Sequence, residues 1–256
     1  MELFANAIQG LSVGALAFCA GAVFVAAVIR GFTGFGSSLM WVPSLSLVLP
    51  PVAVVPITFL LEAAASMHLL PSVRKQSDWP SLWRIWLGAA VGVPAGLYII
   101  SVVPADVTRA AVAVTVIAAA SLLWRGVRLK AVFNGAQVTL VGGAAGLLTG
   151  SVGIPGPPVF LYFLSAPLDI AVSRASIITF LLGAGVLGSI FAAVQGLLGV
   201  DSLVRAAMLL PLVLGGNYLG AHAFGRADPE RARRGALVVL MTIGAVLLGR
   251  VIYTAG

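Results

Sequence analysis

Long apolar stretches that carry almost no charged side chains dominate this sequence. The first of them, from about residue 8 to residue 29, contains no Asp, Glu, Lys or Arg. Only 9% of the chain is charged and 60% is hydrophobic, whereas a soluble domain carries about 25% charged residues. A chain so poor in charge cannot cover a surface that faces water, so we place it in the lipid bilayer. The stretches also lack the alternation of barrel strands, which predicts an all-α polytopic membrane protein.

Further apolar stretches follow the first, separated by short loops. They cover, approximately, residues 38–49, 52–70, 82–103, 105–124, 135–148, 158–166, 170–198, 203–223 and 231–253. Most of them are long enough to cross the roughly 30 Å hydrocarbon core as a helix. Residues 38–49 and 158–166 are too short to do so alone, and we interpret them as half-helices.

The charged residues, cysteine and histidines exclude several kinds of protein. The net charge of +7 does not indicate a nucleic-acid partner, because the cations lie at the ends of apolar stretches. The lone Cys19 cannot form an intrachain disulfide, and His68 and His222 belong to no metal-binding pattern. We therefore expect no cofactor and no metal. The N-terminal M-E-L-F-A-N lacks the basic residues of a signal peptide, so we interpret the first stretch as a retained helix.

Two short breaks rich in glycine and proline interrupt the apolar pattern. The first, from Arg30 to Pro43, reads R-G-F-T-G-F-G-S-S-L-M-W-V-P, and the second, from Thr149 to Pro158, reads T-G-S-V-G-I-P-G-P-P. Glycine weakens a helix by about 1 kcal/mol, and proline removes a helical hydrogen bond. Broken backbone at membrane depth in two matching halves is typical of a transporter's binding site. Two tight turns that let helices pack are the alternative.

The two halves of the chain resemble each other. Short matches recur in constant order with offsets of 119 to 125 residues: Thr58-Phe59-Leu60-Leu61 with Thr179-Phe180-Leu181-Leu182, and Pro104, Arg109 and Arg125 with Pro229, Arg234 and Arg250. This order indicates a duplication. We expect a first repeat over residues 1–130 and a second over residues 131–256, each with about five helical segments.

The distribution of Lys and Arg predicts that the second repeat is inverted relative to the first. If all five segments of each half cross, most of the cations fall on one side, as the positive-inside rule requires of the cytoplasm. Both termini then lie on the non-cytoplasmic side of a bacterial inner membrane. If the short segments only re-enter the membrane, the repeat is parallel and the cations divide almost evenly between the two sides.

The start of each short segment is a candidate anion site. A helix N-terminus presents unpaired N–H groups and about half a positive charge, and glycine lets a ligand approach the backbone. We expect the two N-termini to face each other near the membrane midplane and to bind a small anion. Helix packing is the alternative role of the glycines. The residues concerned are Gly34, Gly36, Ser37 and Ser38 in the first break, and Gly153, Gly156, Pro157 and Pro158 in the second.

Two ionisable residues of the first half lie at membrane depth. Arg30, at the edge of the first break, either contacts the anion or reaches out to the cytoplasmic headgroups. Glu62 lies inside the third apolar stretch, where a carboxylate is costly, so it either couples transport to a proton or pairs with Arg30. Their counterparts in the second half are Thr149 and Gly183, so the duplication requires neither charge.

At the two breaks the sequence resembles a known family. G-F-T-G-F-G-S-S-L-M-W-V-P and G-L-L-T-G-S-V-G-I-P-G-P-P-V-F-L-Y are similar to the paired glycine-rich motifs of the TauE/SafE sulfite exporters. The length and the duplication agree with that family over nearly the whole chain. Ser37 and Ser38 stand where the first motif usually has glycines, and Pro155 replaces a glycine of the second. The resemblance implies export or uptake of sulfite, sulfonates such as sulfoacetate, or other small organosulfur or carboxylate anions.

We therefore predict a secondary transporter that moves a small sulfur anion by alternating access, as one half rocks on the other. An anion channel, a carboxylate transporter and an intramembrane enzyme or assembly factor are the alternatives, although we find no enzyme signature. Coupling to protons and assembly into a homo-oligomer stay open. The candidate substrate-binding residues are Arg30, Gly34, Phe35, Gly36, Ser37, Ser38, Gly153, Ile154, Gly156 and Pro157, with Glu62 as the coupling residue.

Overall fold

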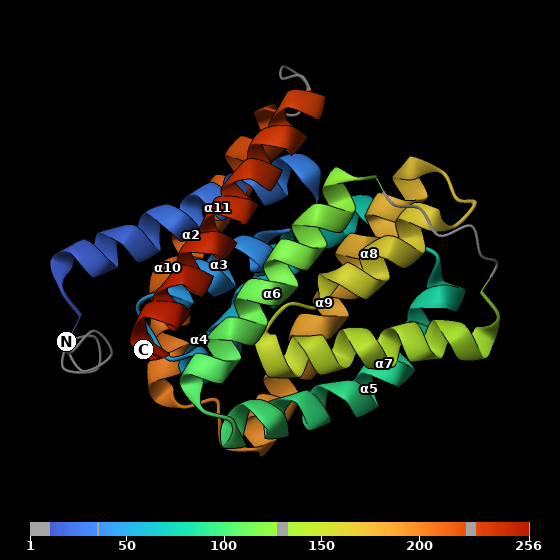
Figure 1. The fold of residues 1–256 in the computed structure, drawn as a ribbon. Helices are drawn as coiled ribbons and strands as arrows, with labels where there is room; N and C mark the ends of the chain where they lie inside the picture. The colour runs from blue at the N-terminus through green and yellow to red at the C-terminus, as the bar shows by residue number, and fades with distance from the viewer. Residues whose placement is uncertain (1–10, 35, 127–132, 224–228, 256) are drawn as a thin grey trace.

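The computed structural model describes residues 11–34, 36–126, 133–223 and 229–255. This part of the chain forms ten helices and no strand (Figure 1). The helices are α2 (Val13–Thr33), α3 (Ser37–Ser46), α4 (Pro51–Val73), α5 (Trp79–Val102), α6 (Ala105–Trp124), α7 (Gly135–Val152), α8 (Gly156–Ser165), α9 (Ile170–Val194), α10 (Val200–Ala223) and α11 (Pro229–Ala255). Some predictions fall outside the described residues: the candidate site residue Phe35, the start of the first stretch at residues 8–10, and the repeat boundary at residue 130.

The helices follow the apolar stretches closely, and local capping explains the differences. α6 has the predicted bounds, whereas α2 begins only at Val13, because the Ser12 hydroxyl accepts a hydrogen bond from the Ala15 N–H and caps the helix. α7 begins after Asn134, whose side chain forms a reciprocal capping box with Gln137. The two short segments are helices of 10 residues each, about 15 Å long, so neither can cross a bilayer alone.

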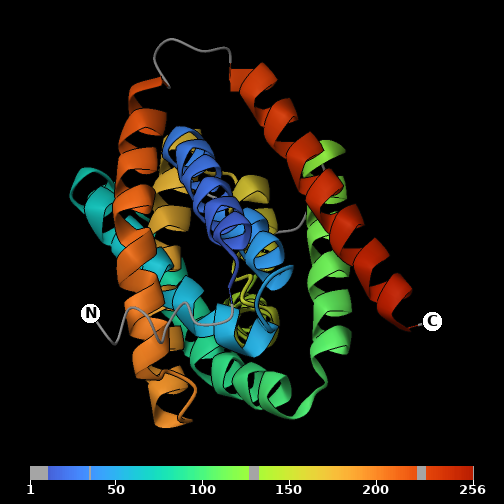
Figure 2. The same ribbon diagram turned by 90° about the vertical axis from the view of Figure 1, so that its left-hand side faces the viewer.

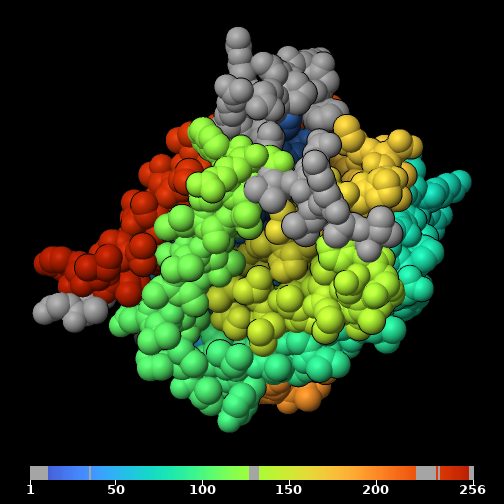
Figure 3. Space-filling view, turned by 45° about the vertical axis from the view of Figure 1, so that its right-hand side comes forward, coloured from blue at the N-terminus to red at the C-terminus, as the bar shows by residue number. Residues whose placement is uncertain are grey.

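Seven of the described helices, namely α2, α4, α5, α6, α7, α9 and α10, are long and apolar enough to cross a membrane. This finding confirms the predicted all-α membrane protein. Large apolar side chains project from their outer faces, as expected of a surface that contacts lipid tails. Leu87, Val91, Val107 and Leu140 are each more than half exposed. Figure 3 shows one such face, where α6 and α7 are neighbours.

The two halves of the sequence are interleaved in the fold. α5 of the first half packs along α7 of the second, and α10 of the second half packs along α2 of the first. α4 packs against α9, and α6 packs against α11. Figure 2 shows α10 beside α2 and α11 beside α6. These pairings are reciprocal, because exchanging the halves turns α5–α7 into α10–α2 and leaves α4–α9 and α6–α11 unchanged. The orientation of the repeats in the membrane stays a prediction.

Glycine allows the closest of these helix contacts. In the α5–α7 pair, a methyl group on any glycine of two facing rows would lie within 3.0 Å of backbone atoms of the opposite helix. Such rows of small residues are typical of tight helix pairs in membranes. The α2–α10 pair has similar contacts at Gly31 and Gly220. The packing surrounds α4, the most buried of the spanning helices, which carries Glu62. The facing rows are Gly88, Gly92 and Gly96 on α5, and Gly142, Gly146 and Gly150 on α7.

Candidate anion-binding site

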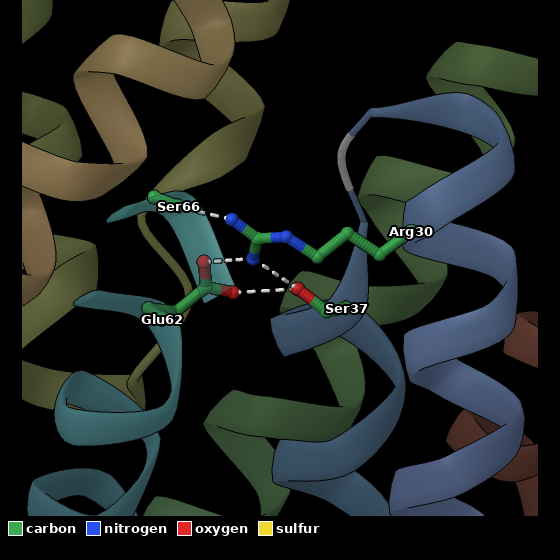
Figure 4. Close-up of polar contacts among 4 residues, drawn as sticks. All are labelled: Arg30, Ser37, Glu62 and Ser66. Atoms are coloured by element: carbon green, nitrogen blue, oxygen red, sulfur yellow. Dashed lines mark hydrogen bonds and ion pairs between the residues drawn. The ribbon is translucent and has the colours of Figure 1, made fainter. Parts of the chain in front are cut away.

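At the first break the chain reverses direction between α2 and α3. Gly34 and Gly36 have φ angles of 85° and 91°, in the left-handed region that glycine adopts without strain. The Gly34 N–H donates to the Arg30 carbonyl at 2.6 Å and closes α2. α3 then starts at Ser37, as predicted, and runs back beside α2 (Figure 4). Gly36 is the residue that caps α3, so the Ser37 hydroxyl is available for contacts outside its own helix.

Four side chains from three helices form a polar cluster at the start of α3 (Figure 4). Arg30 of α2 donates from Nη1 to Ser37 Oγ at 2.7 Å, and the same nitrogen forms an ion pair with Glu62 Oε2 of α4. Arg30 Nη2 donates to Ser66 Oγ of α4 at 2.5 Å. Ser37 Oγ donates in turn to Glu62 Oε1 at 2.7 Å. The Glu62 carboxylate therefore lies at the N-terminus of α3, where the helix dipole stabilises a negative charge.

This polar cluster is buried inside the protein. Arg30 and Ser37 are 0% exposed, and Glu62 is 2% exposed. The alternative that Arg30 reaches out to the lipid headgroups is therefore wrong, and its alternative role as the ion-pair partner of Glu62 is confirmed. Removing one partner of a buried ion pair costs about 3–5 kcal/mol, because the other charge is left unpaired. Among the described residues, Arg30 Nε has no hydrogen-bond partner, so the guanidinium retains one N–H for a further acceptor.

The backbone beside the cluster has an open position at Gly36. Gly36 is buried, yet no described atom beyond its chain neighbours lies within 4 Å of the position where its Cβ would project. Ser38, the next residue of α3, is also buried. The Arg30 guanidinium, the Ser37 hydroxyl and the first amides of α3 together offer the kinds of donor that bind a small oxyanion.

A second arginine reaches the first break from the other half of the chain. Arg174 lies in the second turn of α9, and its side chain passes over Gly34. A Cβ on Gly34 would lie 2.7 Å from Arg174 Nε and 3.4 Å from its Cδ. In the sequence, Arg174 is one of the cations whose distribution predicts the membrane topology. The one available signal was that Arg174 is the single charged residue of α9.

Ser66 is the other contact that sequence reasoning missed. It follows Glu62 by four residues, so it shares a helix face with the carboxylate, and this spacing could have identified it. Its hydroxyl accepts the hydrogen bond from Arg30 Nη2 and so holds the second nitrogen of the guanidinium. Arg30 is thus oriented by contacts from both α3 and α4.

The second break has an apolar environment. Gly153, with φ 71°, ends α7 in the left-handed conformation. A Cβ on Gly153 would lie 3.0 to 3.4 Å from side-chain atoms of Val55, Val42 and Thr58. Ile154 is fully buried. The second break therefore packs against the sides of α3 and α4.

At the N-terminus of α8, Gly156 is covered by a side chain of the same helix. The ring of Phe160 lies over Gly156, where a Cβ would come within 2.2 Å of two ring carbons. This arrangement follows from the spacing, because residues four apart are neighbours on a helix and Gly156 has no side chain. Pro157 lines a small apolar crevice with Ala119 and Leu122 of α6. The expectation that the two helix N-termini face each other stays a prediction.

The two breaks lie close together but at different levels along α4. Thr58, which contacts Gly153, precedes Glu62 by four residues, or about 6 Å along the helix. The candidate residues accordingly fall into two groups. Arg30, Gly34, Gly36, Ser37 and Ser38 lie around the Glu62 carboxylate, whereas Gly153, Ile154, Gly156 and Pro157 lie in apolar packing one turn away or farther.

Comparison with known proteins identifies a family that this chain matches. The family model described as "Sulfite exporter TauE/SafE" matches residues 19–247. Over 228 residues the chain is 30% identical to a protein of Cupriavidus necator named "Probable sulfite/organosulfonate exporter TauE". The match covers 86% of this chain and 87% of that protein. No solved structure matches the chain.

Proposed function

The chain belongs to the TauE/SafE family of sulfite exporters, and from that premise we propose that it transports a small sulfur anion across a bacterial inner membrane. Sulfite and organosulfonates are the substrate class, as the name of the Cupriavidus relative suggests for that protein. The bias of Lys and Arg toward one side supports an orientation with both termini outside the cytoplasm.

The observation that carries this proposal is the buried guanidinium at the start of α3. A fully buried arginine is costly in a membrane, and such residues mark substrate or ion pathways. Arg30 retains an N–H without a partner among the described residues, and Gly36, whose Cβ position is open, directly precedes Ser37, which Arg30 contacts. The planar guanidinium fork suits the oxygens of a sulfite or sulfonate group.

Glu62 is the coupling residue of the proposed cycle. Its carboxylate makes the contacts with Arg30 and Ser37 that an oxyanion at the α3 N-terminus would make. A substrate anion and ionised Glu62 therefore compete for the same donors. Protonation of Glu62 removes its charge and releases Arg30 to the substrate, so an anion and a proton bind together and leave together.

Alternating access in this fold requires moving bodies other than the two sequence halves. Each long helix has its main partner in the other half, and the α5–α7 contact joins backbone to backbone along three glycines of each helix. Residues 1–130 cannot rock as a unit against residues 131–256 without breaking these contacts. We propose that cross-half pairs such as α2–α10 and α5–α7 move as units about the central α4–α9 pair.

Transport by purified protein in proteoliposomes tests the proposal. We expect saturable uptake of labelled sulfoacetate, competition by sulfite, and counterflow exchange between labelled and unlabelled substrate. Arg30→Gln should abolish uptake, whereas Arg84→Gln, the same charge change on an exposed residue of α5, should not. Currents without counterflow would indicate a channel, and competition by small carboxylates but not sulfonates would indicate a carboxylate transporter. Either result would contradict the proposed function.

A further inference from the structure

The first break receives cations from both halves of the chain. Arg30 comes from α2, and Arg174 comes from α9, where it is the single charged residue. The Arg174 side chain crosses the backbone of Gly34, which lies one turn beyond Arg30 and donates its N–H to the Arg30 carbonyl. Arg30 and Gly34 are about 6 Å apart along the axis of α2, so the two arginines contact neighbouring turns of the chain.

The repeat does not account for Arg174. At the offset of 121 residues that relates Thr58 to Thr179, the counterpart of Arg174 in the first half is Ala53. Arg30 and Glu62 also lack charged counterparts, since Thr149 and Gly183 take their places. These three charges without charged counterparts thus come from helices that meet at the first break.

The two arginines differ in exposure, as expected if one contacts the buried end of a bound anion and the other contacts its outer end. Arg30 is fully buried and held by Glu62, Ser37 and Ser66, whereas Arg174 is half-buried. The Arg30–Glu62 pair carries no net charge while Glu62 is ionised. Arg174 is a cationic side chain that the second half contributes beside Gly34, where charge can steer an anion toward the break.

The geometry points to Arg174 as the second substrate contact, so that the bound anion bridges the two halves of the chain and carries two negative charges. This assignment rests on the proposed function. Arg30 and Arg174 each bring a guanidinium to the break, so a dianion can present one negative group to each. Sulfoacetate has a sulfonate at one end and a carboxylate at the other, and each end suits a guanidinium fork. Methanesulfonate has the same sulfonate and only one charge.

Arg174→Gln tests this assignment when sulfoacetate and methanesulfonate are compared in the same proteoliposomes. Hydrogen bonds to charged groups are strong, so we expect the half-saturating concentration of sulfoacetate to rise about tenfold or more in this variant. For methanesulfonate we expect a rise of less than about threefold, because that substrate needs only Arg30. Arg84→Gln removes an exposed arginine of α5 and should change neither value.

An equal loss for both substrates, with a lower melting temperature, would mean that Arg174 only holds the end of α2, and it would overturn the assignment. No change for either substrate would overturn it as well. Arg174→Lys provides the test if the glutamine variant does not fold. Lysine keeps the positive charge but lacks the planar guanidinium fork. The affinity for sulfoacetate should therefore fall by about threefold relative to the affinity for methanesulfonate. An unchanged ratio would contradict the assignment. If the wild-type protein carries neither substrate, the proposed function itself fails.

Discussion

The two breaks occupy equivalent places in the repeated sequence, yet their surroundings have opposite chemistry. The first has an arginine, a glutamate and serine hydroxyls at the start of its half-helix. The second has valines, a threonine and a phenylalanine ring in the corresponding region. At Gly183, the counterpart of Glu62, the indole ring of Trp86 takes the place of a side chain, because a Cβ there would lie 2.2 Å from Trp86 Nε1. A broken helix alone is therefore not a binding site, and side chains decide which break can hold an anion.

The difference also separates two uses of glycine. Gly34 and Gly153 both have the left-handed backbone that ends a helix. At Gly153 the missing side chain lets α7 pack against α3 and α4, whereas at Gly34 it lets an arginine cross the backbone. We therefore expect substitutions at the first break to change transport and stability, and those at the second to change stability alone.

Removing Arg30 should have the largest effect. Arg30→Gln leaves the Glu62 carboxylate buried without its cation, so we expect a loss of about 3–5 kcal/mol in the free energy of unfolding. Transport should fall below detection. Thr149→Val is the matched change at the second break, where the hydroxyl donates to the Ala145 carbonyl of its own helix, and it should cost less than about 1 kcal/mol. Thermal unfolding and uptake measurements on both variants check these values. Equal losses of stability and transport in the two variants would contradict the difference between the two breaks.

Substituting the two left-handed glycines sharpens the comparison. Gly34→Ala and Gly153→Ala should each cost at least about 1–2 kcal/mol, because alanine is strained at these φ angles. Gly34→Ala also displaces Arg174, so it should raise the half-saturating sulfoacetate concentration about tenfold. Gly153→Ala protein that folds should keep wild-type affinity. A large affinity change in Gly153→Ala would show that the second break takes part in binding.

The pH dependence of binding tests the role of Glu62. Because the proposed cycle binds a proton together with the anion, methanesulfonate affinity should rise as pH falls, by up to about tenfold per pH unit. Arg30 is the charged group that faces Glu62, and Arg174 lies near the same break. Methanesulfonate stays anionic throughout, so its own titration does not interfere. The Glu62→Gln variant should bind methanesulfonate tightly at every pH. If its affinity changed with pH as steeply as that of the wild type, Glu62 would not be the coupling residue.

Removing the Ser37 hydroxyl should have the smallest effect. Ser37→Ala loses the acceptor for Arg30 and the donor to Glu62, so we expect a cost of about 1–2 kcal/mol in stability and a loss of about tenfold in affinity. Pro157→Ala is the comparison at the second break, since Pro157 faces the crevice with α6. It should leave affinity unchanged, and an effect as large as that of Ser37→Ala would place substrate at both breaks.

Local patterns in the sequence predict the helices and the breaks, because capping residues, glycines and apolar runs act on their own segment. The Arg30–Glu62 pair was one of two alternatives, since two opposite charges at membrane depth have few other partners. The arrival of Arg174 over Gly34 depends on how α9 of the other half packs, and no pattern within one segment encodes that contact. The interleaving of the two halves could not be predicted for the same reason. The distribution of charge indicates on which side of the membrane a loop lies, but not which helices pack together.

The most direct test of the central claim locates a bound sulfonate in crystals. Bromomethanesulfonate carries an anomalous scatterer next to the group that should bind. We predict a bromine peak at the first break, with the sulfonate oxygens in hydrogen-bond reach of the Arg30 guanidinium and the Ser37 hydroxyl. A peak beside Gly153 and Gly156 instead, with none near Arg30, would contradict this account.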